Sequence, residues 1–267
     1  MTGLAITGRS LRDRRGSLIW WAVGIFLYTA MIMAVWPVIE DNKEFEELAK
    51  SYPEALKAMM GGPDAFDAFT TPAGFLDTYL YSMILPFILV GLAVAMGAAL
   101  LGGDEEDGKL ELLLSYPVTR TSAVGQKALA MTTAVVAIAA LVVLLIFAVG
   151  SLVDLDVGIA GLLSATLGTA LFALLHGQIA MLGGAVLGRR GVALGVGWGV
   201  ALGGYLLNVL SGIDSSLSWL RWLSPLHYAT ANTPLNNGPP VEYLALLAAL
   251  VLATTATLVA FRRHDLR

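Results

Sequence analysis

The sequence predicts an all-α membrane protein with six transmembrane helices. Of its 267 residues, 57% are hydrophobic and 13% are charged, and the mean hydropathy is +0.75. Globular chains average about 45–50% apolar and about 25% charged residues. Six uncharged stretches account for 150 positions, and the shortest has 19 residues. A helix needs about 20 apolar residues to cross the hydrocarbon core of a bilayer, so each stretch can span it. This composition argues against a water-soluble enzyme.

The expected spans follow these stretches along one domain of residues 1–267. They are residues 17–38, 78–102, 128–152, 161–187, 192–210 and 243–261. Ahead of the first span we expect a short basic amphipathic segment, with Leu4 and Leu11 toward lipid and its arginines toward headgroups. A disordered basic tail is the alternative interpretation of this segment.

The distribution of basic residues predicts the orientation. If the N-terminus and alternate loops lie inside, the inside holds 12 of the 16 Lys and Arg residues. Because Lys and Arg are enriched in cytoplasmic loops, both termini are expected in the cytoplasm. We expect a multi-pass protein of the cell membrane of a prokaryote.

The longest polar stretch, residues 40–77, is expected to be an outer loop. Its apolar residues recur at spacings of three and four, which predicts a helical lid interrupted at Pro53. Eight acids and three lysines lie between residues 40 and 67, and they favour a solvated acidic face over a cation site.

Few polar side chains lie within the spans, and no metal site is expected. Cysteine is absent, and the three histidines match no metal-ligand spacing. His176 and Gln178 are interpreted as interhelical hydrogen-bonding residues, because no intramembrane acid or base accompanies them. A proton relay is the alternative.

The fifth span has a repeated glycine at every fourth position. Gly195, Gly199 and Gly203 lie on one helix face, which predicts close packing against another helix. That helix can belong to the same chain or to a second copy.

The inner segment, residues 103–127, predicts a short amphipathic helix at the membrane surface. Four acids from Asp104 to Asp107 begin it, where a helix N-terminus favours negative charge. Leu110, Leu113 and Leu114 fall on one side, and Pro117 ends the helix. An acidic leading edge is repelled by anionic lipid, so the leucines are expected to face a protein partner.

This segment resembles the coupling segment of the ABC-2 type permeases. The pattern Glu-Glu-x-Gly-x-Leu-Glu-x-Leu-Leu-x-x-Pro-Val-Thr-Arg runs from Glu105 to Arg120, and Lys127 follows seven residues later. The resemblance covers essentially the whole chain, including the basic N-terminal segment and the six spans. It implies that ATPase coupling is carried by Glu105, Glu106, Gly108, Leu110, Glu111, Leu113, Leu114, Pro117 and Arg120.

The resemblance also implies the partners. Two copies of an ABC ATP-binding subunit and a second copy of this permease are expected, together with membrane lipid and no nucleic acid. The chain has no phosphate-binding loop of the Gly-x-x-x-x-Gly-Lys-Ser/Thr type, so ATP and Mg²⁺ are expected on the separate subunit, and no cofactor or catalytic residue is expected in this chain. The alternatives are an ATP-independent carrier or channel, or a membrane scaffold. An intramembrane hydrolase is disfavoured, because His176 has no acid in its span.

Aromatic residues of the first two spans indicate a possible substrate pathway. Large apolar surfaces suit amphipathic or hydrophobic cargo such as drugs, antibiotics, lipids or peptides, moved outward. Ordinary lipid-facing aromatics are the alternative. The candidate pathway residues are Trp20, Phe26, Tyr28, Tyr79, Phe87 and, in the fifth span, Asn208.

Overall fold

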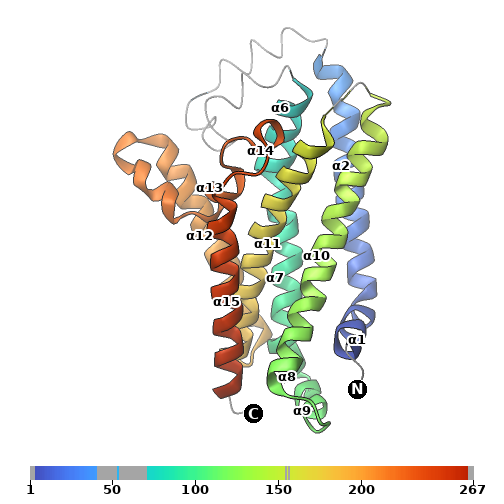
Figure 1. Cartoon of the computed structure of the whole chain (residues 1–267), viewed down its shortest axis with the longest axis vertical. Coiled ribbons are helices and arrows are strands. Elements are labelled where there is room, and N and C mark those ends of the chain that lie inside the picture. The colour runs from blue at the N-terminus through green and yellow to red at the C-terminus, as the bar shows by residue number, and fades with distance from the viewer. Residues whose placement is uncertain (1–3, 41–52, 54–70, 154, 156, 264–267) are drawn as a thin grey trace.

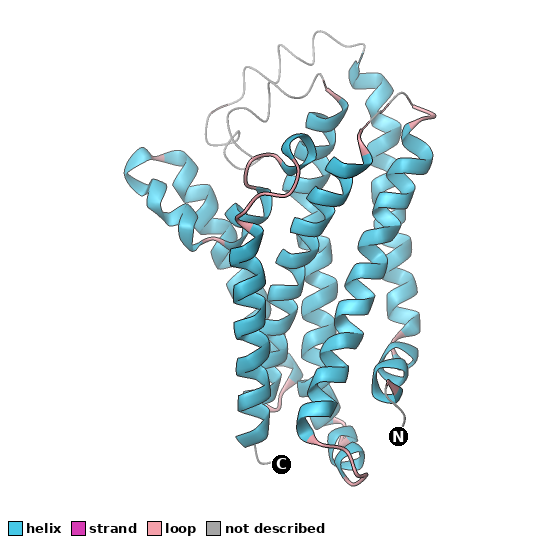
Figure 2. Ribbon diagram, in the orientation of Figure 1, coloured by secondary structure: helices cyan, strands magenta, loops and turns pink. Residues whose placement is uncertain are grey.

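The computed structural model describes residues 4–40, 53, 71–153, 155 and 157–263. Over these residues the chain is helical and contains no strand (Figure 2). Six helices in this part of the chain are long and apolar enough to cross a membrane. The predicted class, an all-α membrane protein with six spans, is confirmed.

Five of the six spanning helices are longer than the corresponding uncharged stretches; the fourth is the exception. The second is continuous and joins α6 (Pro72–Leu76), η2 (Asp77–Ile84), α7 (Leu85–Ala98), η3 (Ala99–Gly103) and α8 (Asp104–Glu106). The other five are α2 (Arg15–Glu40), α10 (Arg120–Gly150), α11 (Ile159–Leu187), α12 (Arg190–Ile213) and α15 (Tyr243–Arg263). The shorter helices are α1 (Ala5–Asp13), α9 (Lys109–Leu114), η4 (Ser215–Leu223), α13 (Pro225–Thr230) and α14 (Pro234–Asn237). Charged residues therefore lie within the ends of several spanning helices.

The helices form one bundle with α11 at its centre. This helix packs against α7, α10, α12 and α15. Both ends of the described chain lie at one end of the bundle, together with α1, α8 and α9 (Figure 1). We call this the basal end, and the opposite end, which carries α6, α13 and α14, the distal end. The predicted helical lid falls on residues 41–52 and 54–70, which lie outside the described residues.

The C-terminal part of α12 projects from the side of the bundle, and η4 folds back against it (Figure 1). Asp214 begins η4, and its carboxylate accepts a hydrogen bond from the Ser216 backbone N–H at 2.8 Å. This bond lowers the pKa of Asp214. Trp219 and Trp222 of η4 are exposed, which leaves an aromatic surface on the projection.

The closest backbone approach at the bundle centre is between α7 and α11. A Cβ atom added at Gly97 would lie 2.1 Å from the carbonyl oxygen of Gly177. A Cβ added at Gly177 would lie 2.8 Å from the Cβ of Ala93. Glycine at both positions therefore lets these two helix backbones touch, which is how helices associate in lipid.

No described residue of the chain packs against the glycine face predicted for α12. Gly195, Gly199 and Gly203 have open space at their Cβ positions. The buried face of α12 is instead a second row of small residues, formed by Ala193, Gly197, Ala201 and Gly204. Gly197 packs against Ala180 of α11 and Val94 of α7. Close packing of the predicted face therefore stays a prediction about a second chain.

The N-terminal amphipathic helix is present as α1, but it packs on the chain itself. Ile6 donates its backbone N–H to the side chain of Gln126 at 3.0 Å, and the Thr7 hydroxyl donates to the Gln126 carbonyl at 2.9 Å. Leu4 is exposed, as expected of a lipid-facing residue, whereas Leu11 packs against the hydrophobic core. The expectation that Leu11 faces lipid is therefore wrong.

Candidate functional site

The segment between the second and third spans is a rigid helical turn at the basal end. Span 2 ends at Glu106, the chain reverses at Gly108, and α9 follows directly. Gly108 has φ of +68°, a left-handed conformation that glycine adopts without strain. Its backbone N–H donates to the Glu105 carbonyl at 2.9 Å. A tight left-handed turn thus fixes α9 relative to the end of span 2.

The predicted leucine face of α9, formed by Leu110, Leu113 and Leu114, packs against the chain's own helices. Leu110 is fully buried, and Leu113 and Leu114 pack partly against the same cluster. The other buried members of this cluster are Leu101, Val124, Met181, Ala185 and Phe261. The prediction that this leucine face needs a separate protein to cover it is wrong, because the ends of spans 2, 3, 4 and 6 cover it. Leu110 anchors α9 to the bundle and does not face a partner.

A different part of the same segment is exposed. Glu106, Glu111 and Pro117 are exposed, and so are Leu112 and Tyr116, with relative exposures of 69% and 52%. We call Glu106, Glu111, Leu112, Tyr116 and Pro117 the α9 surface. Two large apolar side chains on a charged, projecting turn mark a surface suited to protein contact.

The first two acids of the segment are buried in the bundle. Asp104 and Glu105 are 7% and 8% exposed. Glu105 lies against Gly188, where its Oε1 would be 2.6 Å from an added Cβ, and Gly188 has φ of +64°. The interpretation of these two acids as an exposed leading edge is therefore wrong, because they belong to the packed end of span 2.

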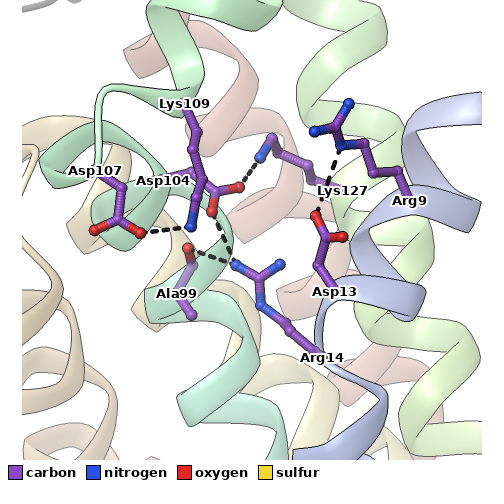
Figure 3. A network of polar contacts seen from close by, with 8 residues as sticks. All are labelled: Arg9, Asp13, Arg14, Ala99, Asp104, Asp107, Lys109 and Lys127. Atoms are coloured by element: carbon purple, nitrogen blue, oxygen red, sulfur yellow. Dashed lines mark hydrogen bonds and ion pairs between the residues drawn. The ribbon is translucent and has the colours of Figure 1, made fainter.

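Asp104 is the centre of a buried charge cluster that sequence reasoning missed (Figure 3). Its Oδ1 accepts a hydrogen bond from Arg14 Nη2 at 3.0 Å, and its Oδ2 pairs with Lys127 Nζ. Arg14 also donates to the Ala99 carbonyl at 2.9 Å. We call Arg14, Asp104 and Lys127 the Asp104 cluster. It ties the α1–α2 junction, the end of span 2 and the start of span 3 together just ahead of α9.

A second, exposed ion pair lies beside this cluster. Lys109 Nζ donates to Asp107 Oδ2 at 2.6 Å, and both side chains are more than half exposed (Figure 3). The pKa of Asp107 is lowered, first by the hydrogen bond and charge of Lys109 and then by the charges of Arg190 and Arg14. Lys109 has a raised pKa, first through the same hydrogen bond. The positive charges of Lys109, Arg190 and Arg14 therefore stabilise the ionised form of Asp107.

Arg120 closes the segment and joins it to the last span. It donates to the Phe261 carbonyl at 3.1 Å, and its guanidinium carbon lies 5.8 Å from the centroid of the Phe261 ring. Arg262 donates to the Thr121 hydroxyl at 3.1 Å. Arg120 thus positions α10 against α15.

The candidate pathway residues lie in different surroundings in the described structure. Tyr28 donates its hydroxyl to the Tyr79 carbonyl at 2.9 Å, which joins spans 1 and 2. Phe87 packs edge-on against Tyr205 of α12, with ring centroids 5.0 Å apart. The other three candidates are Trp20 and Phe26, which are exposed, and Asn208, which is half-buried.

The two intramembrane polar residues make different contacts. Gln178 donates to the Thr257 hydroxyl at 3.0 Å, so it links α11 to α15 as an interhelical hydrogen bond. His176 Nδ1 lies 2.7 Å from the Phe172 carbonyl, one turn earlier on its own helix. The prediction of an interhelical hydrogen bond is confirmed for Gln178. It is wrong for His176, whose hydrogen bond lies within α11.

Six spanning helices and a rigid helical turn at one end define a multi-pass membrane protein with a projecting contact surface. The family model described as "ABC-2 family transporter protein" matches residues 4–266. The chain belongs to this family, which supplies the membrane permease of transporters that associate with an ABC ATP-binding subunit. A search of curated proteins finds no match.

Proposed function

We propose that this chain is the permease subunit of an ATP-driven exporter. Two copies of the chain assemble in the membrane, and two ABC ATP-binding subunits bind beneath them at the basal end. Both termini then lie in the cytoplasm, and the cargo is an amphipathic or hydrophobic molecule. ATP and Mg²⁺ are held by the partner subunits.

One observation carries the proposal, namely how α9 is held. Its exposed surface projects at the basal end, while Leu110 and the Asp104 cluster fix it to the bundle. Because α9 is anchored in this way, a partner that displaces its exposed surface also moves the helices to which α9 is anchored. Closure of the ATPase dimer on ATP would thus shift spans 1, 2 and 3 together, which changes the populations of two membrane-domain conformations.

The α9 surface gives the test of ATPase coupling. Leu112→Asp is expected to reduce co-purification of an ATPase and the ATP hydrolysis of the purified complex by at least about tenfold, because an unpaired charge buried at an interface costs several kcal/mol. Its unfolding temperature in detergent is expected to stay at the wild-type value, since Leu112 is exposed. The measurements are subunit stoichiometry and ATP turnover of the affinity-purified protein.

Leu110→Ala provides the matched contrast on the same helix. It removes a fully buried side chain, so we expect a loss of about 2–5 kcal/mol in permease stability. A Leu112→Asp permease that retains an equimolar ATPase with normal turnover would contradict the proposed contact. An equal fall in unfolding temperature for both variants would show that Leu112 is structural.

The open glycine face supports the second copy. Gly195, Gly199 and Gly203 have open Cβ positions, so a helix of another chain can approach them closely. Gly199→Leu is expected to leave the fold of the single chain intact and to shift the detergent-purified protein from dimer to monomer. Leu202→Ala, a change at a neighbouring exposed residue of α12, is the control. Light scattering measures both, and a dimeric Gly199→Leu protein would place this face against lipid.

A further inference from the structure

An open groove runs along α2, with Ile88 of α7 beside it. Trp21 of α2 and Trp198 of α12 meet above Gly91 of α7, where an added Cβ would lie 2.9 Å and 3.4 Å from their rings. The apolar part of the groove, about 470 Å³, is lined by Ser17, Trp20, Trp21, Gly24, Ile25 and Ile88. Ser17 and Trp21 also line a second cavity of about 250 Å³ at the basal end, so the two cavities adjoin each other.

The basal cavity is charged where the groove is apolar. Its lining includes three basic residues, Arg14, Lys109 and Arg190, and three acidic ones, Asp13, Asp104 and Asp107. Asp13 pairs with Arg9. Asp104 pairs with both Arg14 and Lys127, and Asp107 pairs with Lys109. Arg190 has no ion-pair partner among the described residues, and its Cδ lies 3.4 Å from a Cβ added at Gly103. Counted together with Arg9 and Lys127, the ion-pair partners that lie outside the lining, these groups comprise five basic and three acidic residues, an excess of two positive charges.

The dimensions of the groove match one leaflet of a membrane. Arg14 lies at the charged end, just ahead of α2, and Ile25 lies at the apolar end. Eleven residues separate them, which is about 16 Å at the helical rise of 1.5 Å per residue. Half of a hydrocarbon core is about 15 Å thick. The groove therefore presents positive charge at the headgroup level and an apolar channel as deep as one acyl layer.

We propose that this groove binds one anionic glycerophospholipid, with its phosphate between Arg14 and Arg190 and an acyl chain along Trp21, Gly24 and Ile25. Basic pockets between transmembrane helices are suited to anionic headgroups. The proposed orientation of the permease places this lipid in the cytoplasmic leaflet, but the binding itself does not depend on ATPase coupling or on the exported cargo. The lipid headgroup lies beside the Asp104 cluster, which holds the end of span 2 just ahead of α9.

The test is lipid retention by the full-length permease. Delipidated protein is exposed to dioleoylphosphatidylglycerol or dioleoylphosphatidylcholine, and bound lipid is counted by native mass spectrometry. We expect the wild type to retain one phosphatidylglycerol in preference to phosphatidylcholine. Arg190→Gln is expected to reduce that retention by about tenfold, because one hydrogen-bonded charge contact is lost.

A second variant tests the acyl channel without changing charge. Gly24 has open space at its Cβ position, so Gly24→Leu fills the groove without disturbing the fold, and it is expected to reduce retention of both lipids. The controls are Arg189→Gln, an exposed arginine next to Arg190, and Gly16→Leu, an open glycine of α2; neither residue lines the groove or the basal cavity.

Three results would overturn the proposal. Equal losses for Arg189→Gln and Arg190→Gln would show diffuse attraction to a basic surface. Full retention in Gly24→Leu would show that only the headgroup binds. The third result combines two measurements: the wild type retains no lipid, and the Gly24→Leu variant no longer forms the dimer. Together they would show that a second copy of the chain occupies the groove.

Discussion

Gly97→Ala is expected to destabilise the membrane domain by about 3 kcal/mol or more, the larger end of the range for overpacked cores. The added Cβ would lie 2.1 Å from the Gly177 carbonyl oxygen and 3.0 Å from its carbon. Both groups are backbone, so neither can rotate away as a flexible side chain does. To accept one methyl group, α7 and α11 must move apart along their contact.

The consequence spreads because α11 is the central helix. Separation from α7 also disturbs the contacts that α11 makes with α10, α12 and α15. We expect Gly97→Ala to be recovered mainly as aggregate, with a lower unfolding temperature in the soluble fraction. Size-exclusion chromatography and thermal unfolding in detergent measure both.

Gly125→Ala is the matched control, since it makes the same chemical change at an exposed position of another spanning helix, α10. Its Cβ meets open space, and alanine favours helix over glycine by up to about 1 kcal/mol. Its unfolding temperature is therefore expected to equal or slightly exceed the wild-type value. A Gly97→Ala protein that behaves like Gly125→Ala would refute the close α7–α11 contact.

The six spans could be predicted from the sequence because uncharged length is a property of each stretch by itself. What covers each face depends on other stretches. In α12, two rows of small residues run in parallel, one through Gly195 and Gly199 and the other through Ala193 and Gly197. Spacing identifies both rows equally, and only the positions of Val94 and Ala180 decide that the second is buried within the chain.

The candidate site shows the same division. The helical turn and the leucine periodicity of α9 could be predicted from local sequence, whereas the burial of Leu110 requires Val124, Met181 and Phe261 from three other spans. Asp104 could not be distinguished from the three acids that follow it. Its partners Arg14 and Lys127 are 90 and 23 residues away. The charge pattern predicts only that these two residues lie on the inner side of the membrane.

Asp104→Asn is expected to cost about 3–5 kcal/mol, because it removes one partner from a buried charge cluster. Lys127 is 3% exposed, so its ammonium would remain in the bundle without a carboxylate. The asparagine amide also offers donors where the lysine and Arg14 need acceptors. Arg14 is less affected, since its side chain is 18% exposed and also donates to the Ala99 carbonyl.

The double variant separates lost attraction from uncompensated charge. Lys127→Met alone leaves Asp104 paired with Arg14, so we expect a smaller loss than for Asp104→Asn. Combining Lys127→Met with Asp104→Asn removes the buried ammonium, and the double variant is expected to be more stable than Asp104→Asn alone. Asp107→Asn, which breaks the exposed pair with Lys109, should leave the unfolding temperature close to the wild-type value. Thermal unfolding in detergent at neutral pH compares the four proteins with the wild type, and strictly additive losses would show that Asp104 and Lys127 do not act as a pair.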